Sequence, residues 1–271
     1  MDIRGSALDP SETAGSLATW PDEAIIYCIA GIWTDTWWDN PVAWKSWVGA
    51  FHGWSEAEWQ QFATLWARTQ RLAPPAADRA RSALMAAYRV YFYNWRRTPG
   101  GSTHGDVRHA ARQVRADLQT LRNVVLVGHS KGGAVIKYLL GADWPWDAGT
   151  RPLGAIFVDA PLDPLRELVG AAFRWGLRPI LRWQPPSDVS CLTINNWLDT
   201  SGGRLRGVEN IQVWLWNDNL QPYPPHGMKS RQAPEALSRL RALIDAQHRR
   251  SAPHSPAASP SLNDREGACD G

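Results

Sequence analysis

A serine between two glycines lies where an apolar run gives way to a helix-like run. Four aliphatic residues, Val124–Val127, lead into it, and Ala134–Leu140 follow. In the pattern glycine-any-serine-any-glycine, the serine occupies a sharp strand-to-helix turn with its hydroxyl above the sheet. The helix that follows directs its N-terminal amides and positive dipole end at a developing oxyanion. We therefore predict a nucleophile elbow centred on Ser130; the alternative is a glycine-rich turn in which this serine only caps the helix. The five residues of the turn are Gly128, His129, Ser130, Lys131 and Gly132.

A serine nucleophile of this kind needs an acid and a histidine, which follow it in that order along the chain. His226 is the only histidine between the elbow and the last helical pattern, and it lies in a loop rich in proline and glycine. It is the expected base. Asp199 follows the apolar run Cys191–Asn195 and is favoured as the acid. Asp159, which follows the preceding apolar run, stays open as the alternative acid.

Two backbone amides are expected to form the oxyanion hole. One is the N–H of Lys131, directly after the nucleophile, whose side chain we expect to be solvated. The other is the N–H of Ile32, because Gly31 lets the chain turn at the end of the first apolar run. A strand-end glycine without a catalytic role is the alternative reading of Gly31. His129 is expected to pack in the interior, since its position beside Ser130 aims it away from the hydroxyl.

Short apolar runs and helical patterns alternate around these residues. The runs are apolar on consecutive positions, as expected for strands that are covered on both faces. A capping box at Ser55 and Glu58 opens a helix to about Gln70, residues 106–121 show helical spacing, and Pro234 opens a last helix. Strands that alternate with helices predict a doubly wound α/β fold with parallel pairing. The runs are Ile25–Trp33, Tyr88–Trp95, Val124–Val127, Leu153–Val158, Cys191–Asn195 and Ile211–Trp216.

The 271 residues fit one large domain, which we place at residues 22–249. Residues 1–21 are expected to be loosely ordered, and the tail at 250–271, rich in serine, proline and alanine, to be disordered. Insertions are expected at about 34–87 and 162–186. Eight of the 17 tryptophans fall between Trp33 and Trp66 and either cap an acyl-binding cleft or pack this insertion onto the sheet. The second insertion has an apolar face suited to an interfacial helix or to a helix docked on the domain.

The composition excludes several classes of partner. The net charge is only +3, and no basic run interleaved with aromatic residues suggests nucleic-acid binding. The spacing of the three cysteines matches neither a disulfide framework nor a metal site. Catalysis by a serine, a histidine and an acid needs no metal and no organic cofactor, so we expect neither. The sequence contains no evident secretory signal and no apolar run of membrane-spanning length, which predicts a cytoplasmic protein. The oligomeric state is not predicted.

The chain resembles lipase- or esterase-like serine hydrolases of the α/β-hydrolase superfamily. The features that carry this resemblance are the elbow at Ser130, Asp199 in a loop of small residues, and His226 before a glycine. The likeness extends from about Ile25 to the last helix. Lys131 replaces the apolar or glutamine residue common after the nucleophile, and Ala30-Gly31 replaces a His-Gly pair.

The resemblance implies an α/β-hydrolase fold, with a mostly parallel central sheet, helices on both faces and cap or lid insertions. It also implies hydrolysis of a carboxylic ester through an acyl-enzyme. The implied substrate is a small acyl or lipid-like molecule, and a peripheral contact with a lipid interface stays open. Acyl transfer, thioester or amide cleavage on the same triad, and a non-catalytic binding protein of this fold, are the alternatives.

Overall fold

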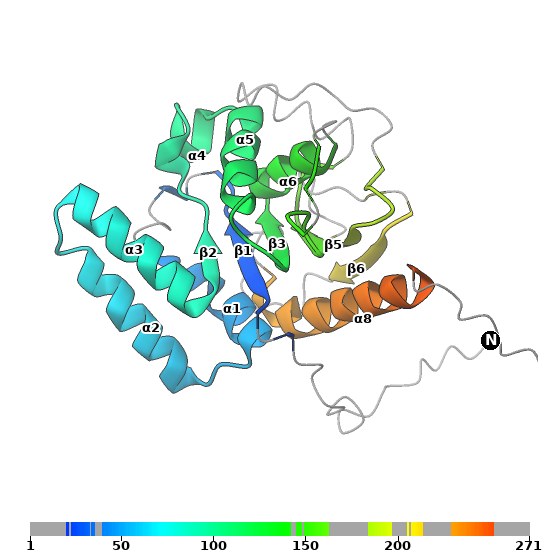
Figure 1. Cartoon of the computed structure of the whole chain (residues 1–271), viewed down its shortest axis with the longest axis horizontal. Helices are drawn as coiled ribbons and strands as arrows, with labels where there is room; N and C mark the ends of the chain where they lie inside the picture. The colour runs from blue at the N-terminus through cyan, green and yellow to red at the C-terminus, as the bar shows by residue number, and fades with distance from the viewer. Residues whose placement is uncertain are drawn as a thin grey trace, which may run out of the picture.

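A computed structural model describes residues 20–21, 23–32, 34–35, 40–141, 145–147, 149–162, 184–196, 205, 207–213 and 229–251. Within them, six strands form one sheet in the order β2-β1-β3-β4-β5-β6 (Figure 1). Every neighbouring pair is parallel, which confirms the predicted doubly wound parallel sheet. Each strand overlaps one of the predicted apolar runs. The strands are β1 (Ile25–Ile29), β2 (Val90–Phe92), β3 (Val124–His129), β4 (Gly154–Val158), β5 (Ser190–Asn196) and β6 (Glu209–Val213).

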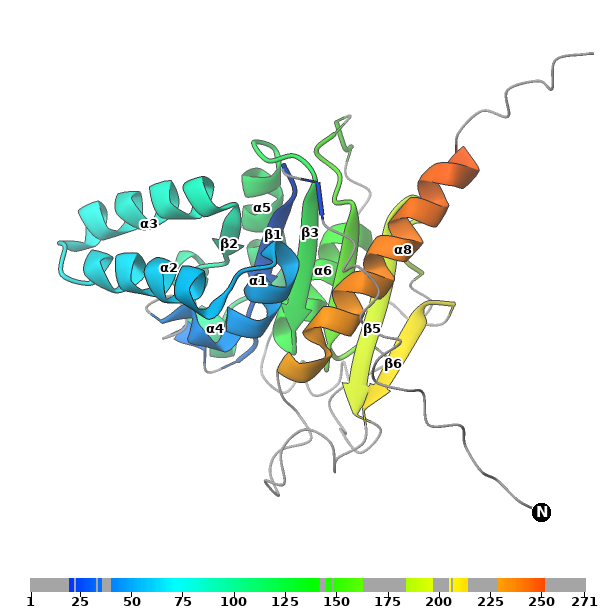
Figure 2. The ribbon, with the colours of Figure 1, turned by 90° about the horizontal axis from the view of Figure 1, so that it is seen from below.

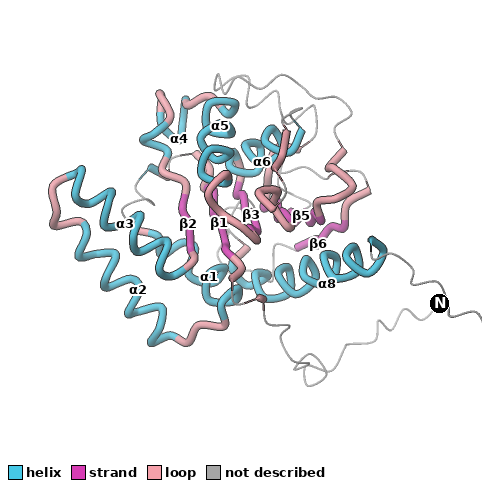
Figure 3. The backbone as a smooth tube through the Cα atoms, viewed as in Figure 1, coloured by secondary structure: helices cyan, strands magenta, loops and turns pink. Residues whose placement is uncertain are grey.

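Helices cover both faces of this sheet, as Figure 3 shows for the row of strands between them. One face packs against α5 (Val107–Leu118) and α6 (Lys131–Gly141). The opposite face packs against α1 (Lys45–His52), α2 (Glu56–Thr69), α3 (Pro74–Tyr88) and α8 (Ala233–Ser251). A short helix, α4 (Gly101–His104), lies between β2 and α5 in the chain.

The strand side chains supply both cores in alternation. In β1, Ile26 and Cys28 pack into the core with α1 and α8, whereas Tyr27 and Ile29 pack into the core with α5 and α6. All four are at most 1% exposed. Since successive side chains of a strand point to opposite faces, burial on both faces requires apolar residues at consecutive positions. This explains the pattern seen in the sequence.

The ends of two helices are fixed by the side chains that the sequence indicates. Ser55 closes the predicted capping box of α2: its N–H donates to Glu58 Oε2 at 2.6 Å, and its Oγ accepts from the Glu58 N–H at 3.3 Å. Asp106 caps α5, with Oδ1 accepting from the Arg108 N–H at 2.7 Å. Such caps satisfy amides that have no partner within the helix.

The tryptophan-rich insertion packs onto the sheet. Trp44, Trp47, Trp59 and Trp66 are at most 3% exposed and belong to the same core as α8. Helices α2 and α3 form a hairpin that extends from the β2 edge (Figure 2). The packing interpretation is therefore confirmed for these tryptophans, and a cap over a cleft is wrong for them. Trp54 is partly buried against the same core, and the other three tryptophans of the set, Trp33, Trp37 and Trp38, lie outside the described residues.

The order in which strands are added to the sheet switches sides at β1. Strand β2 pairs with one edge of β1, and β3 pairs with the other. In open α/β sheets, ligands bind at the carboxyl ends of the strands beside such a switch point. The pairing of Ile29 with Gly128 brings the loop after β1 next to the turn after β3. The topology therefore places Gly31 and Ser130 side by side.

Predictions for residues 1–19, 163–183 and 252–271 fall outside the described part of the chain. Among the helices that the structure describes, none has the length and apolarity needed to cross a bilayer.

Candidate active site

Ser130 occupies a strained turn between β3 and α6. Its φ is +53°, in the left-handed region that non-glycine residues avoid at a cost of about 1–2 kcal/mol. Two backbone hydrogen bonds hold it there: its N–H donates to Val158 O at 2.8 Å, and its carbonyl accepts from the Gly133 N–H at 2.9 Å. The residue is 5% exposed, so it is more enclosed than an elbow standing above the sheet was expected to be. A strained serine held by its surroundings is typical of a functional turn.

The glycines on either side of Ser130 are required because neighbouring backbone and side-chain atoms lie too close to leave room for a Cβ. A methyl group on Gly132 would overlap the carbonyl oxygen of Ile29 at the end of β1. A methyl group on Gly128 would lie 2.7 Å from Gly133 N and 2.7 Å from Ile136 Cδ1. The first turn of α6 thus packs directly on the ends of β1 and β3. Only glycine leaves room for this geometry at the two positions.

The loop after β1 contacts the side chain of Ser130. A Cβ placed on Gly31 would lie 2.6 Å from Ser130 Cβ and 3.1 Å from Ser130 Oγ. The structure therefore brings Ser130 together with the Gly31–Ile32 peptide and with the first amide of α6. These are the positions that the sequence predicts for an oxyanion hole. His129, the last residue of β3, is buried at 7% exposure.

Lys131 contradicts the expectation of a solvated side chain. It is completely buried, with 0% exposure. Its Nζ donates to Ser102 O at 2.8 Å and lies 4.6 Å from the centre of the Trp95 ring. Burial lowers the pKa of Lys131 from 10.5 to about 7, and the carboxylates of Asp35 and Asp106 oppose the shift. The prediction is wrong because the first turn of α6 faces α4 and Trp95, a contact between segments that no local pattern indicates.

Asp159 lies at the end of β4, next to Val158, the strand residue that holds the Ser130 amide. It is 0% exposed, its N–H donates to Ile194 O at 2.9 Å, and its Oδ2 lies 2.8 Å from the Nζ of Lys229, which is also buried. Lys229 follows His226 by three residues in the sequence and leads toward α8. Sequence reasoning missed this lysine, since nothing in its neighbours indicates a buried partner. The ion pair joins the end of β4 to the segment that precedes α8.

The proposed acid and base are not placed by this structure. Asp199 and His226 lie outside the described residues, so their roles stay predictions.

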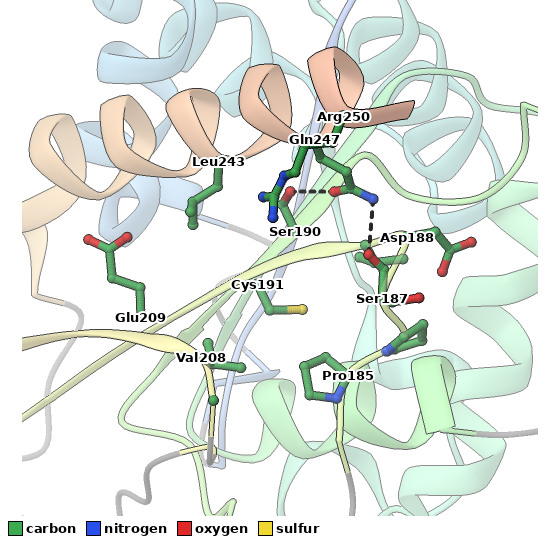
Figure 4. Close-up of a pocket in the computed structure, with 13 residues that line it drawn as sticks. Pro185, Ser187, Asp188, Ser190, Cys191, Val208, Glu209, Leu243, Gln247 and Arg250 are labelled. Carbon is green, nitrogen blue, oxygen red and sulfur yellow. Dashed lines mark hydrogen bonds between the residues drawn. The ribbon is translucent and has the colours of Figure 1, made fainter. Parts of the chain in front are cut away.

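A hollow of about 530 Å³ opens near the amino ends of β5 and β6 (Figure 4). Ser190 and Gln247 line it and are joined by a hydrogen bond of 2.7 Å between Oγ and Oε1. Ser190 begins β5, whereas Ser130 follows the end of β3. Because all strands are parallel, Ser190 lies at the amino ends of the strands and Ser130 at their carboxyl ends. This hollow is therefore separate from the candidate active site.

Comparison with protein families agrees with this architecture. The family model described as "Alpha/beta hydrolase family" matches residues 34–262. No curated protein sequence matches the chain. Among solved structures, the chain is similar to an extracellular alpha/beta-hydrolase from a Paenibacillus species, described as sharing structural and functional homology with tobacco salicylic acid binding protein 2. The two are 12% identical, the match covers 81% of this chain and 98% of the other, and the TM-score is 0.33. At that TM-score the likeness carries no argument about function.

Proposed function

This chain belongs to the alpha/beta hydrolase family, and on that basis we propose that it is a serine hydrolase that cleaves carboxylic esters. The observation that carries the proposal is the setting of Ser130. It has a positive φ at the carboxyl end of β3, beside the topological switch point, with Gly31 against its side chain. A serine held in this way supports a role as nucleophile, because its backbone is fixed at the carboxyl ends of the strands, where ligands of such sheets bind.

In the proposed first half-reaction, Ser130 Oγ attacks the acyl carbon of the ester while His226 takes the hydroxyl proton. The carbonyl double bond opens to a tetrahedral oxyanion. When that intermediate collapses, the bond to the alkoxy group breaks, and His226 returns the proton to the departing alcohol. The product is an acyl group on Ser130.

In the second half-reaction, water attacks the acyl carbon and His226 takes its proton. Collapse of the second oxyanion breaks the bond to Ser130, which recovers its proton from His226, and the carboxylic acid leaves. These steps use no metal and no organic cofactor. The N–H groups of Lys131 and Ile32 are proposed to stabilise both oxyanions; one such donor is typically worth about 3–4 kcal/mol.

Asp199 is proposed as the acid that orients the imidazole of His226. The alternative, Asp159, has its carboxylate in an ion pair with Lys229, 2.8 Å away. That pairing supports a structural role for Asp159, since its charge already has a cation beside it and a buried pair is costly to separate.

The proposed substrate is a small acyl or lipid-like molecule, with acyl transfer to another acceptor as a variant of the same chemistry. A peripheral contact with lipid and a cytoplasmic location belong to the proposal as well, and both can be tested by fractionation.

A fluorophosphonate probe, which reacts with activated serines, tests the proposal directly. We expect the native protein to be labelled and the labelling to be lost in Ser130→Ala and His226→Ala. Ser190→Ala is the matched control, because this buried serine is hydrogen-bonded at the amino ends of the strands, away from Ser130. This variant should be labelled like the native protein. Labelling that persists in Ser130→Ala would refute the assignment of the nucleophile.

Two further measurements refine the assignment. Turnover of p-nitrophenyl esters of increasing acyl length defines the preferred acyl group. Asp199→Asn should lower kcat more than Asp159→Asn if Asp199 is the acid, whereas the reverse order would assign that role to Asp159.

A further inference from the structure

The side chain of Lys131 links the nucleophile turn to the short helix α4. Its Nζ donates to Ser102 O at 2.8 Å and approaches Thr103 O at 3.4 Å. The ammonium also faces the ring of Trp95, whose Nε1–H donates to Ala30 O at 3.0 Å. A lysine stem that is fully buried, with its head on backbone carbonyls and an aromatic face, has little freedom to move. The residue after Ser130 thus fixes α4 against the nucleophile turn.

Ser102 in turn holds the segment that follows the proposed oxyanion loop. It is completely buried, and its Oγ accepts a hydrogen bond from the Thr34 N–H at 3.1 Å. Its own N–H donates to Asp35 Oδ1 at 2.8 Å. Two successive residues, Thr34 and Asp35, are therefore attached to one residue of α4.

Thr34 completes the connection to the loop itself. Its side chain is buried, and Oγ1 donates to Gly31 O at 2.5 Å. The carbonyl of Gly31 and the N–H of Ile32 belong to one planar peptide group, in which the two bonds point in opposite directions. A hydrogen bond that fixes the carbonyl therefore fixes the direction of the amide as well.

We propose that Lys131, Ser102 and Thr34 form a buried hydrogen-bonded brace that sets the position of the Ile32 amide relative to Ser130. In the brace, the Lys131 side chain, Ser102 and Thr34 have a positioning role, since they act through the Gly31–Ile32 peptide; the backbone N–H of Lys131 is a separate, direct donor. This inference rests on the proposed function, because an oxyanion hole matters only if Ser130 forms a tetrahedral intermediate. Preorganised donors lower a barrier only when they are held at the site of the developing charge.

Thr34→Val tests the brace, because it removes one hydroxyl and keeps the shape of the side chain. We expect kcat on a p-nitrophenyl ester, and the rate of fluorophosphonate labelling, to fall about tenfold or more. KM should stay within about twofold, since the lost interaction acts in the transition state. Thr34→Ser restores the donor and should recover both rates to within about threefold of the native values.

The matched control is Thr150→Val. Thr150 is buried, and its Oγ1 also donates to a carbonyl three residues earlier, Asp147 O at 2.9 Å. It precedes β4, so it lies at the amino ends of the strands, away from Ser130. It should change stability as Thr34→Val does and leave both rates unchanged. Ser102→Ala removes the acceptor of the Thr34 N–H and should lower the same two rates.

The outcomes separate the brace from the proposed function. Labelling of the native protein combined with native kcat in folded Thr34→Val would refute the brace alone. A loss of kcat that Thr34→Ser does not recover would also refute it, since the shape and not the hydroxyl would then matter. An absence of labelling in the native protein would refute the proposed function and the brace with it.

Discussion

A single methyl group on Gly31 provides a sharp test of the candidate site. Built on the present backbone, the added Cβ lies 2.6 Å from Ser130 Cβ, 3.1 Å from Ser130 Oγ and 3.3 Å from His129 O. Non-bonded carbon atoms prefer separations of about 3.5–4.0 Å, so relief of the closest overlap requires a shift of about 1 Å. Gly31 is not among the residues with positive φ, so the effect of Gly31→Ala is steric and not a matter of backbone strain.

The expected magnitude follows from that displacement. A misplacement of about 1 Å at a reacting group typically costs about 10²-fold in rate. Overpacking of a closely fitted interior costs about 1–3 kcal/mol in the free energy of unfolding. We therefore expect Gly31→Ala to lower fluorophosphonate labelling and ester turnover by about 10²-fold while the protein still folds. Labelling rates and urea unfolding followed by tryptophan fluorescence measure the two effects separately.

Gly49→Ala is the matched control. The same methyl group at this position of α1 meets only Trp54 O, at 3.9 Å. Since alanine is the better helix former by roughly 0.5–1 kcal/mol, this variant should be slightly more stable and should label at the native rate.

A double variant identifies the atom responsible. Ser130→Gly removes the Cβ that the new methyl group meets, so it should relieve the loss of stability caused by Gly31→Ala. We expect an interaction free energy of about 1 kcal/mol or more between the two positions in urea unfolding. Native labelling of Gly31→Ala, or strictly additive effects in the double variant, would refute the contact on which this reasoning depends.

Three other predictions concern the residues around the site and the fold. Gly132→Ala, whose methyl group would overlap Ile29 O, should lower the free energy of unfolding by about 3 kcal/mol or more in urea. Lys131 has a pKa of about 7 in the folded protein, against 10.5 for its ordinary value, so between these values the unfolded chain binds more protons and stability rises with pH. From pH 7 to pH 10, the free energy of unfolding of the native protein should rise by up to about 1.4 kcal/mol per pH unit relative to that of Lys131→Met, as measured by denaturation curves. A difference between the two proteins that does not change with pH would contradict the burial of this amine. Ser55→Ala removes the cap of α2 and should cost about 1 kcal/mol in thermal unfolding without changing the labelling rate.

Strand boundaries were only partly predictable. The apolar run Ile25–Trp33 extends past the end of β1 at Ile29, because Ala30 and Gly31 are buried in the turn against Ser130. A buried turn and a buried strand both require apolar residues, so an apolar run in the sequence does not show where the strand ends and the turn begins. The tryptophans between β1 and β2 pose the same difficulty, since an aromatic cap and a packed insertion have the same composition.

Local patterns in the sequence determined the architecture and the strand-to-helix turn at Ser130. Consecutive apolar positions indicate strands covered on both faces, Ser55 and Asp106 mark helix starts, and the two glycines around Ser130 indicate the close approach that the turn requires. Each of these features depends on residues that are close together in the sequence, so the sequence alone indicates it.

Only the tertiary structure decided what surrounds that turn. Lys131 meets Ser102, Asp159 meets Lys229, and Gly31 meets Ser130, although each pair is distant in the chain. The parallel register of β1 with β3 brings Gly31 to Ser130, the Lys131 side chain reaches from α6 to α4, and the segment before α8 brings Lys229 to the end of β4. A buried lysine and a solvated one have the same sequence neighbours, and the difference arises from the segments that the fold places against them.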